Sequence, residues 1–219
     1  RALHDDLVSA GVGVECLHQR NDVATPVVLH QVLAGGKHRF RFRCPTCGRR
    51  FPKARPLPRS ETANVPLANV FFFDRPSAAA VAIAEAHREA GRLVVFEPSS
   101  KGVAHLFRAA LAAAHVVKAS DQRLKASEGG QTAGFRIITH GLRGLTISHG
   151  DESRQLPALP IRDVVDTGGA GDWTTAAFLA RLPSLCPDDL SLETTADALR
   201  SAQAVAAISC LFAGARGLA

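Results

Sequence analysis

Residues 70–96 read VFFFDRPSAAAVAIAEAHREAGRLVVF, and their pattern predicts an α/β architecture. Two short, uninterrupted apolar runs, Val70–Phe73 and Leu93–Phe96, flank a helix-forming segment, Ser77–Ala90. Strands that are buried on both faces of a parallel sheet carry such runs, because helices cover both faces. The segment is therefore typical of a strand–helix–strand unit whose crossover makes the two strands parallel.

The same alternation continues towards the C-terminus. A second predicted helix is followed by short apolar strands, and two helices close the chain. In order, these elements are helix 103–114, strands 116–117, 136–139, 145–147 and 164–165, and helices 170–182 and 194–210. Alternating strands and helices predict a three-layer α/β/α sandwich with a mostly parallel central sheet.

The first third of the chain has a different pattern. Residues 27–33 and 37–44 each indicate a strand, and Gly35-Gly36 between them is typical of a hairpin turn. Prolines then interrupt regular structure over about twenty residues. These prolines are Pro45, Pro52, Pro56, Pro58 and Pro66. We therefore expect a β hairpin followed by an irregular extension.

The length and composition exclude several classes of protein. A chain of 219 residues suits one large domain. With 46% hydrophobic and 21% charged residues it is globular rather than disordered or fibrous. No apolar run approaches the ~18 residues that cross a bilayer, and no signal peptide precedes the first elements, so we expect a cytoplasmic protein. Methionine is absent even at position 1, so we expect that the natural chain begins before Arg1.

The net charge of +6 is concentrated in one segment. Val23–Ser60 holds nine of the 26 basic residues and no acidic residue, which leaves a balance of −3 elsewhere. A local basic patch attracts phosphates of any kind, including those of a nucleotide. Some of Arg39, Arg41 and Arg43 are expected to face a ligand or a subunit boundary, and a solvated strand face is the alternative.

The five cysteines do not indicate a disulfide scaffold, because their number is odd and no secretory signal is visible. Three of them lie in apolar or mixed surroundings and are expected to be small buried side chains. These are Cys16, Cys186 and Cys210. The segment Cys44-Pro-Thr-Cys47-Gly resembles half of a zinc ribbon, but structural zinc needs four ligands. Cys16, His30 or His38 would have to complete the site, and a tight turn with two reduced thiols is the alternative.

A glycine-rich turn, Asp166-Thr167-Gly168-Gly169-Ala170-Gly171-Asp172-Trp173, joins the strand expected to end at Val165 to a helix that begins near Ala170. Small residues let a ligand approach the backbone, and amides at a helix N-terminus bind anions. The turn is neither a Walker A loop nor a dinucleotide fingerprint, because both spacings are absent. A plain tight connection is the alternative, with Asp172 as a first-turn acid favoured by the helix dipole.

Four stretches carry a resemblance to one family. Asp166–Asp172 closely resembles the D-T-x-G-A-G-D signature of the ribokinase-like (PfkB-type) carbohydrate kinases. Three further segments resemble family motifs in the same order along the chain. These are Phe96–Lys101 (the D-P-N-x-R segment), Thr139–Gly144 (the T-x-G-x-x-G turn) and Ala206–Arg216 (the closing segment of the nucleotide pocket). Thr25-Pro26 fits the family's lid region, so the resemblance implies one kinase domain over 1–219 with a β lid over 23–65.

The resemblance implies an enzyme that transfers the γ-phosphoryl group of ATP to a hydroxyl of a sugar or nucleoside. Backbone amides of Gly169, Ala170 and Gly171 would form the anion hole, and Asp172 would be the general base. Such an arrangement suits phosphoryl transfer, which needs positioning and charge stabilisation. The resemblance further implies Mg²⁺ as a cofactor, with residues for ATP and for a monovalent cation such as K⁺. Those implied for ATP are Thr139, Gly141, Gly144 and Gly214, and Asp166 is implied for the cation.

Two departures from the family pattern bear on this reading. The N-x-x-E motif, which is associated with magnesium, is replaced by Ser120 and Arg123. The family's Gly-Gly sugar-binding signature is absent from the chain. A catalytically silent nucleotide-binding relative is therefore the first alternative, and a zinc-stabilised nucleic-acid binder that uses the basic segment is the second. We also expect a homodimer through Val27–Cys44, because lid strands with exposed phenylalanines need a partner.

Overall fold

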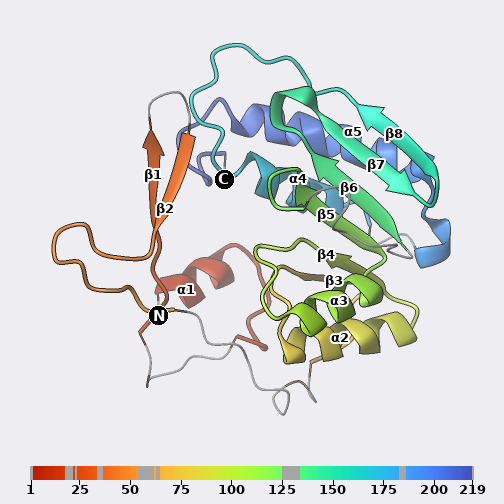
Figure 1. Cartoon of the computed structure of the whole chain (residues 1–219), viewed down its shortest axis with the longest axis horizontal. Helices are drawn as coiled ribbons and strands as arrows, with labels where there is room; N and C mark the ends of the chain where they lie inside the picture. The colour runs from red at the N-terminus through yellow and green to blue at the C-terminus, as the bar shows by residue number, and fades with distance from the viewer. Residues whose placement is uncertain are drawn as a thin grey trace. The chain divides into compact units, whose positions relative to one another are not determined.

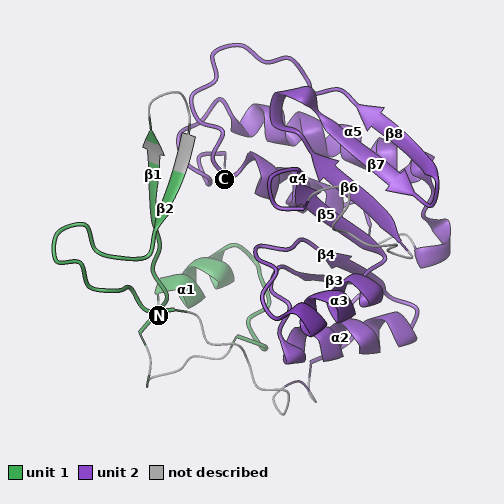
Figure 2. Ribbon diagram, viewed as in Figure 1, with its two compact units in different colours: residues 1–56 green, residues 57–219 purple. Residues whose placement is uncertain are grey.

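The computed structural model describes residues 2–17, 22, 24–33, 37–53, 62, 65–124, 134–182 and 186–218. The chain divides into two compact units, Arg1–Pro56 and Leu57–Ala219 (Figure 2). The expectation of one kinase domain with a lid over 23–65 stays a prediction. Among the described residues, no helix is both long enough and apolar enough to cross a membrane.

The second unit is built on a sheet of six strands in the order β3-β4-β5-β6-β7-β8 (Figure 1). Strands β3 to β6 are parallel, and β7 and β8 continue the sheet antiparallel. The strands are β3 (Val70–Phe73), β4 (Leu93–Phe96), β5 (Val116–Ser120), β6 (Phe135–Thr139), β7 (Leu145–His149) and β8 (Glu152–Leu156). The helices are α2 (Ala78–Glu89), α3 (Ala104–Ala113), α4 (Ala170–Leu179) and α5 (Leu192–Ser209), with 3₁₀ turns η2 (Gly141–Arg143) and η3 (Pro187–Asp189).

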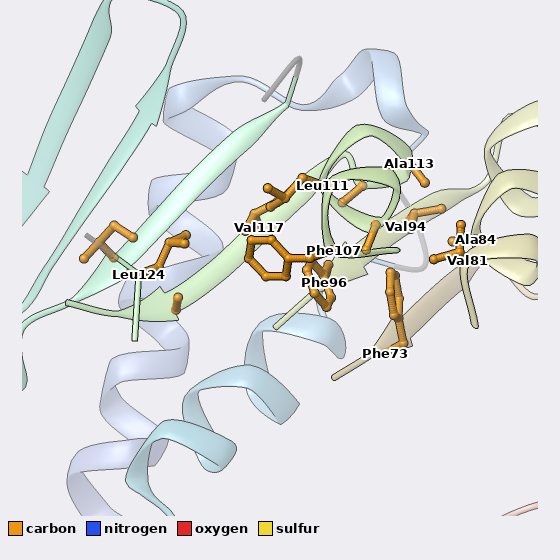
Figure 3. Close-up of a cluster of buried hydrophobic side chains, with 14 residues drawn as sticks. Phe73, Val81, Ala84, Val94, Phe96, Phe107, Leu111, Ala113, Val117 and Leu124 are labelled. Atoms are coloured by element: carbon orange, nitrogen blue, oxygen red, sulfur yellow. The ribbon is translucent and has the colours of Figure 1, made fainter. Parts of the chain in front are cut away.

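Alternation along β4 explains the three layers. Val94 and Phe96 belong to one core cluster, which packs the sheet against side chains of α2 and α3 such as Val81 and Phe107 (Figure 3). Leu93 and Val95 point to the opposite face and belong to the second cluster, with α4 and α5. Because successive side chains of a strand point to opposite faces, a strand that is apolar throughout must be covered on both sides. The predicted α/β/α sandwich is confirmed.

Two predictions about the strands are wrong. Val164 and Val165 do not form a strand, and the amides of Val165 and Asp166 instead donate to the carbonyl oxygen of Cys210, 2.9 and 3.2 Å away. Strand β8 was not expected, because its sequence ESRQL has only one apolar side chain that is buried, Leu156. A strand at the edge of a sheet has a neighbour on one side only, so its side chains can be polar and exposed while its backbone is still paired with that neighbour.

The first unit contains helix α1 (Ala2–Ser9) and a hairpin of β1 (Leu29–Leu33) and β2 (Lys37–Arg41). Its antiparallel register runs from the pair Leu29–Arg41 to the pair Leu33–Lys37, which confirms the two predicted strands. The Gly35-Gly36 turn lies outside the described residues. Helix α1 was not anticipated, since none of its residues is buried and it has no apolar face that would signal it.

Candidate active site

The carboxyl ends of the parallel strands form one edge of the sheet, where open α/β proteins bind ligands. Polar residues follow directly after β3, β4, β5 and β6, at Asp74, Glu97, Asp121 and His140. The carboxylate of Asp172, in the first turn of α4, interacts electrostatically with Asp74 and Glu97. The glycine-rich turn therefore faces this edge, as the sequence predicts for an anion site.

Close packing explains why the turn needs glycine at one position. Gly169 is the N-cap of α4 and has a φ of +85°, in the left-handed region that favours glycine. A Cβ atom added there would lie 2.8 Å from the Cα atom of Ala215. The indole nitrogen of Trp173 donates to the carbonyl oxygen of Ala215 at 2.9 Å, which holds the same two segments together. The start of α4 is thus fixed against the C-terminal segment.

The start of α4 carries backbone amides with the chemistry to bind an anion. The first N–H groups of a helix have no intrahelical acceptor, and the helix dipole makes this end positive. The amide of Ala170 already donates to the carbonyl oxygen of Thr167, at 3.2 Å. An anion that uses the Ala170 amide must therefore displace a long hydrogen bond within the turn.

Two glycine substitutions test the packing of this turn. Gly169→Ala should lower the free energy of unfolding by more than about 1 kcal/mol, because it combines a positive φ with a backbone clash. Gly171→Ala is the matched control for stability, since nothing lies within 4 Å of its added Cβ and it stands inside α4. That change should stabilise by about 0.5–1 kcal/mol. Urea denaturation of both variants measures the difference, and equal effects would contradict the argument.

Asp166 joins the glycine-rich turn to the segment after α5. Its Oδ1 accepts a hydrogen bond from the amide of Gly168 at 2.8 Å, and its Oδ2 accepts one from the amide of Gly214 at 3.0 Å. The structure therefore brings together two residues that were predicted to bind a monovalent cation and the nucleotide, respectively. A carboxylate has about four lone-pair positions, so its chemistry fits a cation in addition to the two amides.

A buried ion pair lies beneath the glycine-rich turn. Lys118 of β5 places its Nζ atom 2.7 Å from Oε1 of Glu97, and the side chains are only 2% and 15% exposed. The same Nζ atom donates to the carbonyl oxygen of Gly171 at 3.2 Å. Lysine is almost never fully buried unless it is paired. The pair thus links two neighbouring strands to the first turn of α4.

Thr175 completes this network from the second turn of α4. Its hydroxyl oxygen lies 2.5 Å from Oε2 of Glu97 and 3.0 Å from the carbonyl oxygen of Gly171. The one hydroxyl proton of Thr175 is shared between Oε2 of Glu97 and the Gly171 carbonyl, and Lys118 donates to Oε1 of Glu97 and to the same carbonyl. A buried network in which each polar group is satisfied is rigid, so it fixes the position of the turn.

The surroundings of Asp172 alter its acidity. Burial raises the pKa of the Asp172 carboxyl above its usual range, because it removes water from the charged form. The negative charge of Glu97 raises this pKa further. The positive charges of Lys118 and Arg123 act in the opposite direction and lower it. A carboxylate with a raised pKa is a better proton acceptor than an ordinary aspartate.

The second cluster of predicted residues lies on the neighbouring strand ends. Thr139 ends β6, Gly141 begins η2, and the amide of His140 donates to the carbonyl oxygen of Gly144 at 2.8 Å. Oδ2 of Asp121 lies 3.0 Å from Nδ1 of His140 and accepts a hydrogen bond from Nη2 of Arg143 at 2.8 Å. These two partners lower the pKa of the Asp121 carboxyl. The T-x-G-x-x-G turn is thus tied to the loop after β5.

The described part of the loop after β5, residues 121–124, offers no divalent metal site. Ser120 and Arg123 stand where a carboxamide and a carboxylate were expected, and the nearby Asp121 carboxylate is engaged by two basic side chains. Among the described residues, no group of three or more His, Cys, Asp or Glu side chains could hold a metal ion. The residues present here do not fit a magnesium ion held by the protein alone.

The cysteines differ from expectation in part. Cys210 is buried, and burial raises the pKa of its thiol, but Cys16 and Cys186 are exposed, contrary to the prediction. None of the five forms a disulfide. Cys44 and Cys47 lie together on a turn of the first unit. The zinc assignment for this pair stays a prediction.

Sequence reasoning missed the buried network that Lys118 and Thr175 form with Glu97. A visible signal was the lysine itself, because it interrupts the buried strand Val116–Ser120, in which the other residues are apolar or small. The sequence could not show that its partner is Glu97, which lies 21 residues earlier.

A largely parallel α/β sheet with a glycine-rich turn and an aspartate at its carboxyl edge belongs to the class of open α/β proteins that bind ligands at this edge. The model of the pfkB family carbohydrate kinases matches residues 1–218, and the chain belongs to this family. Members of the family are phosphotransferases with an alcohol group as acceptor. A comparison with curated proteins finds no match.

Solved structures with the same fold come from several kinases. Aminoimidazole riboside kinase from Salmonella enterica, complexed with aminoimidazole riboside and an ATP analog, is 24% identical, with a TM-score of 0.73 over 98% of this chain and 76% of that one. Fructokinase from Vibrio cholerae O395, bound to fructose, ADP and calcium ion, is 20% identical, with a TM-score of 0.75 and the same coverage. Burkholderia thailandensis nucleoside kinase in complex with inosine is 18% identical, with a TM-score of 0.75 over 99% of this chain and 70% of that one.

Proposed function

We propose that this protein transfers the γ-phosphoryl group of ATP to a hydroxyl group of a sugar or nucleoside, with Asp172 as the general base. The observation that carries the proposal is the position of Asp172. It stands in the first turn of α4, beside the anion-binding amides, and its carboxyl has a raised pKa. A base next to an oxyanion site is the arrangement that phosphoryl transfer to an alcohol requires.

In the reaction, the acceptor hydroxyl lies against the Asp172 carboxylate, which removes its proton as the oxygen attacks the γ-phosphorus atom. The bond from this phosphorus to the β–γ bridging oxygen breaks, and ADP leaves with that oxygen. The amides of Gly169, Ala170 and Gly171 bind the oxygens of the transferred group at the N-terminus of α4. Lys118 is held 3.2 Å from the Gly171 carbonyl and supplies fixed positive charge behind this turn. Charge that is already in place costs no reorganisation when the phosphoryl group moves.

The nucleotide is assigned to the turn that follows β6 and to Gly214. Thr139, Gly141 and Gly144 border the end of β6, and Gly214 is held by Asp166. Asp166 with the backbone near Gly214 would hold a monovalent cation such as K⁺, which would supply positive charge near the nucleotide. Mg²⁺ would arrive with ATP, because this ion binds mainly through substrate phosphates and water. No step here depends on a metal site made by the protein.

One observation favours a second candidate function, a nucleotide-binding relative without catalysis. Arg123 lies close enough to Asp172 to lower the pKa of its carboxyl, and it occupies a position where the family has an acid. An arginine there could bind nucleotide phosphate while the metal contact is lost. The intact Asp172 opposes this candidate, since a binding protein has no need of a base.

Binding and turnover separate the two candidates. We expect ATP to raise the melting temperature, and we expect ADP to form when one member of a panel of pentoses, hexoses and nucleosides is added with Mg²⁺. A silent relative would show the thermal shift with no acceptor-dependent ADP. If ATP causes no thermal shift and no acceptor gives turnover, both proposals are contradicted.

The proposal also includes a homodimer and a cytoplasmic location. Phe40 and Phe42 of the hairpin segment are 53% and 59% exposed, which supports a homodimer through Val27–Cys44. The need for ATP supports a cytoplasmic location. Sedimentation at micromolar concentration should give the mass of a dimer, and a monomer would count against the pairing.

A further inference from the structure

The turn after β2 is a tight, hydrogen-bonded reversal of the chain. The amide of Cys44 donates to the carbonyl oxygen of Arg49 at 2.9 Å, and the amide of Gly48 donates back to the carbonyl oxygen of Cys44 at 3.0 Å. Gly48 has a φ of +70°, which allows the chain to reverse so sharply. A β-bridge between Arg43 and Arg50 closes the turn. Cys44 and Cys47 are thus held on one rigid loop, with both thiols unpaired.

Backbone hydrogen bonds orient the sulfur of Cys44. The backbone amides of Cys47 and Thr46 donate to it. Hydrogen bonds of this kind orient metal ligands and stabilise their charged form. Cys47 is exposed, so its sulfur is accessible beside that of Cys44.

Cys44 and Cys47 are two ligands, and a tetrahedral zinc site needs four. His30 pairs with Phe40, four residues before Cys44. In the part of the chain that the structure describes, no third His, Cys, Asp or Glu joins the pair. Among the described residues, neither Cys16 nor His30 joins the pair in such a group, and the side chain of His38 lies outside them, so the predicted completion stays a prediction.

We propose that Cys44 and Cys47 of two copies of this chain together bind one zinc ion at a two-fold axis. A two-fold interface places the same patch of each copy against the other, so two dithiol turns give four thiolates. The exposed side chains of Phe40 and Phe42, just before the turn, would be covered in the same interface. The proposal does not rest on the kinase activity.

The charge of the surroundings suits this metal centre. Zinc with four thiolates carries a net charge of −2, and the turn is flanked by Arg43, Arg49 and Arg50 with no acidic residue between Lys37 and Lys53. Arg43 is held in place, because its Nη1 atom donates to the carbonyl oxygen of Gly48 at 3.0 Å. Fixed cations around a dianionic centre offset its charge and reduce the repulsion between the two basic segments.

The test measures zinc content and molar mass on the same preparation, purified with a thiol-free reductant. We expect one zinc ion for every two chains by elemental analysis and a dimer by light scattering. Removal of the zinc with a strong chelator should give monomers, and cobalt should restore the dimer with the absorption bands of a tetrahedral thiolate site. This arm needs no substitution, so it does not depend on the folding of a variant.

Substitutions locate the site. Cys44→Ser and Cys47→Ser should each lose the zinc and the dimer, while Cys16→Ser and Cys186→Ser, at exposed cysteines outside the turn, should keep both. The proposal is overturned by a reduced chain without zinc, by one zinc ion in each monomer, or by Cys44→Ser that binds zinc as the parent does.

Discussion

Asp172→Asn is expected to lower the rate of phosphoryl transfer by roughly 10²–10⁴-fold, the usual range for the loss of a general base. The amide side chain fits the same space in the first turn of α4 but cannot accept the proton. Binding of ATP should persist, because the backbone amides of α4 and the residues predicted to bind ATP are unchanged. The measurement is the turnover rate of an accepted substrate, per folded molecule.

Stability separates this role from that of an acid that only favours the helix dipole. Because the pKa of Asp172 is raised in the folded protein, its ionisation costs stability as pH rises above the range of an ordinary carboxyl. Asp172→Asn should therefore be at least as stable as the parent at neutral pH, and its advantage should vanish in acid. A dipole role alone predicts a loss of ~0.3–1 kcal/mol with little change in rate.

A matched control for this substitution is Asp151→Asn, at an exposed residue between β7 and β8. It should change neither the rate nor the melting temperature. Turnover by Asp172→Asn within about threefold of the parent would disprove the base assignment, since threefold corresponds to under ~1 kcal/mol of barrier.

Lys118→Met is expected to cost about 3–5 kcal/mol of unfolding free energy, because it leaves the buried carboxylate of Glu97 without its cation. The double variant Lys118→Met with Glu97→Gln should recover much of this loss, since no uncompensated charge remains. Thermal denaturation of the two single variants, the double variant and the parent gives the interaction energy.

The pH dependence of turnover shows whether the same pair also acts on Asp172. The Lys118 charge lowers the pKa of Asp172 and the Glu97 charge raises it. The acid limb of the rate profile should therefore move to higher pH in Lys118→Met and to lower pH in Glu97→Gln. A merely structural pair would leave the limb in place in both variants, and that result would contradict the assigned electrostatic role.

The sequence predicts elements well where burial leaves a local pattern. Strand β4 matches its predicted bounds, Leu93–Phe96, because all four residues are buried between two helical layers. The pair Val164–Val165 misled the prediction, since its apolar side chains are exposed and its backbone bonds to Cys210 rather than to a strand. Local apolarity does not tell a strand from a connection that uses distant partners.

The candidate site likewise has one part that the sequence predicts and another part that it does not. The glycine-rich turn and Asp172 are visible in the sequence because their spacing is contiguous. The ion pair of Lys118 and Glu97 joins two strands, so it depends on the register and order of the sheet. The link between Asp166 and Gly214 spans 48 residues and depends on how the chain returns after α5. Contacts of this kind follow from topology and not from local composition.

The fate of the γ-phosphoryl group tests the central claim most directly. The full chain is incubated with ATP labelled at the γ-phosphate, Mg²⁺, K⁺ and the panel of sugars and nucleosides, and the labelled products are identified by mass. We predict that the label moves to a hydroxyl of one acceptor, in equal amount to the ADP formed, and that Asp172→Asn removes this product. Label that stays in ATP or appears only as inorganic phosphate would contradict the assignment of this chain as a working sugar or nucleoside kinase.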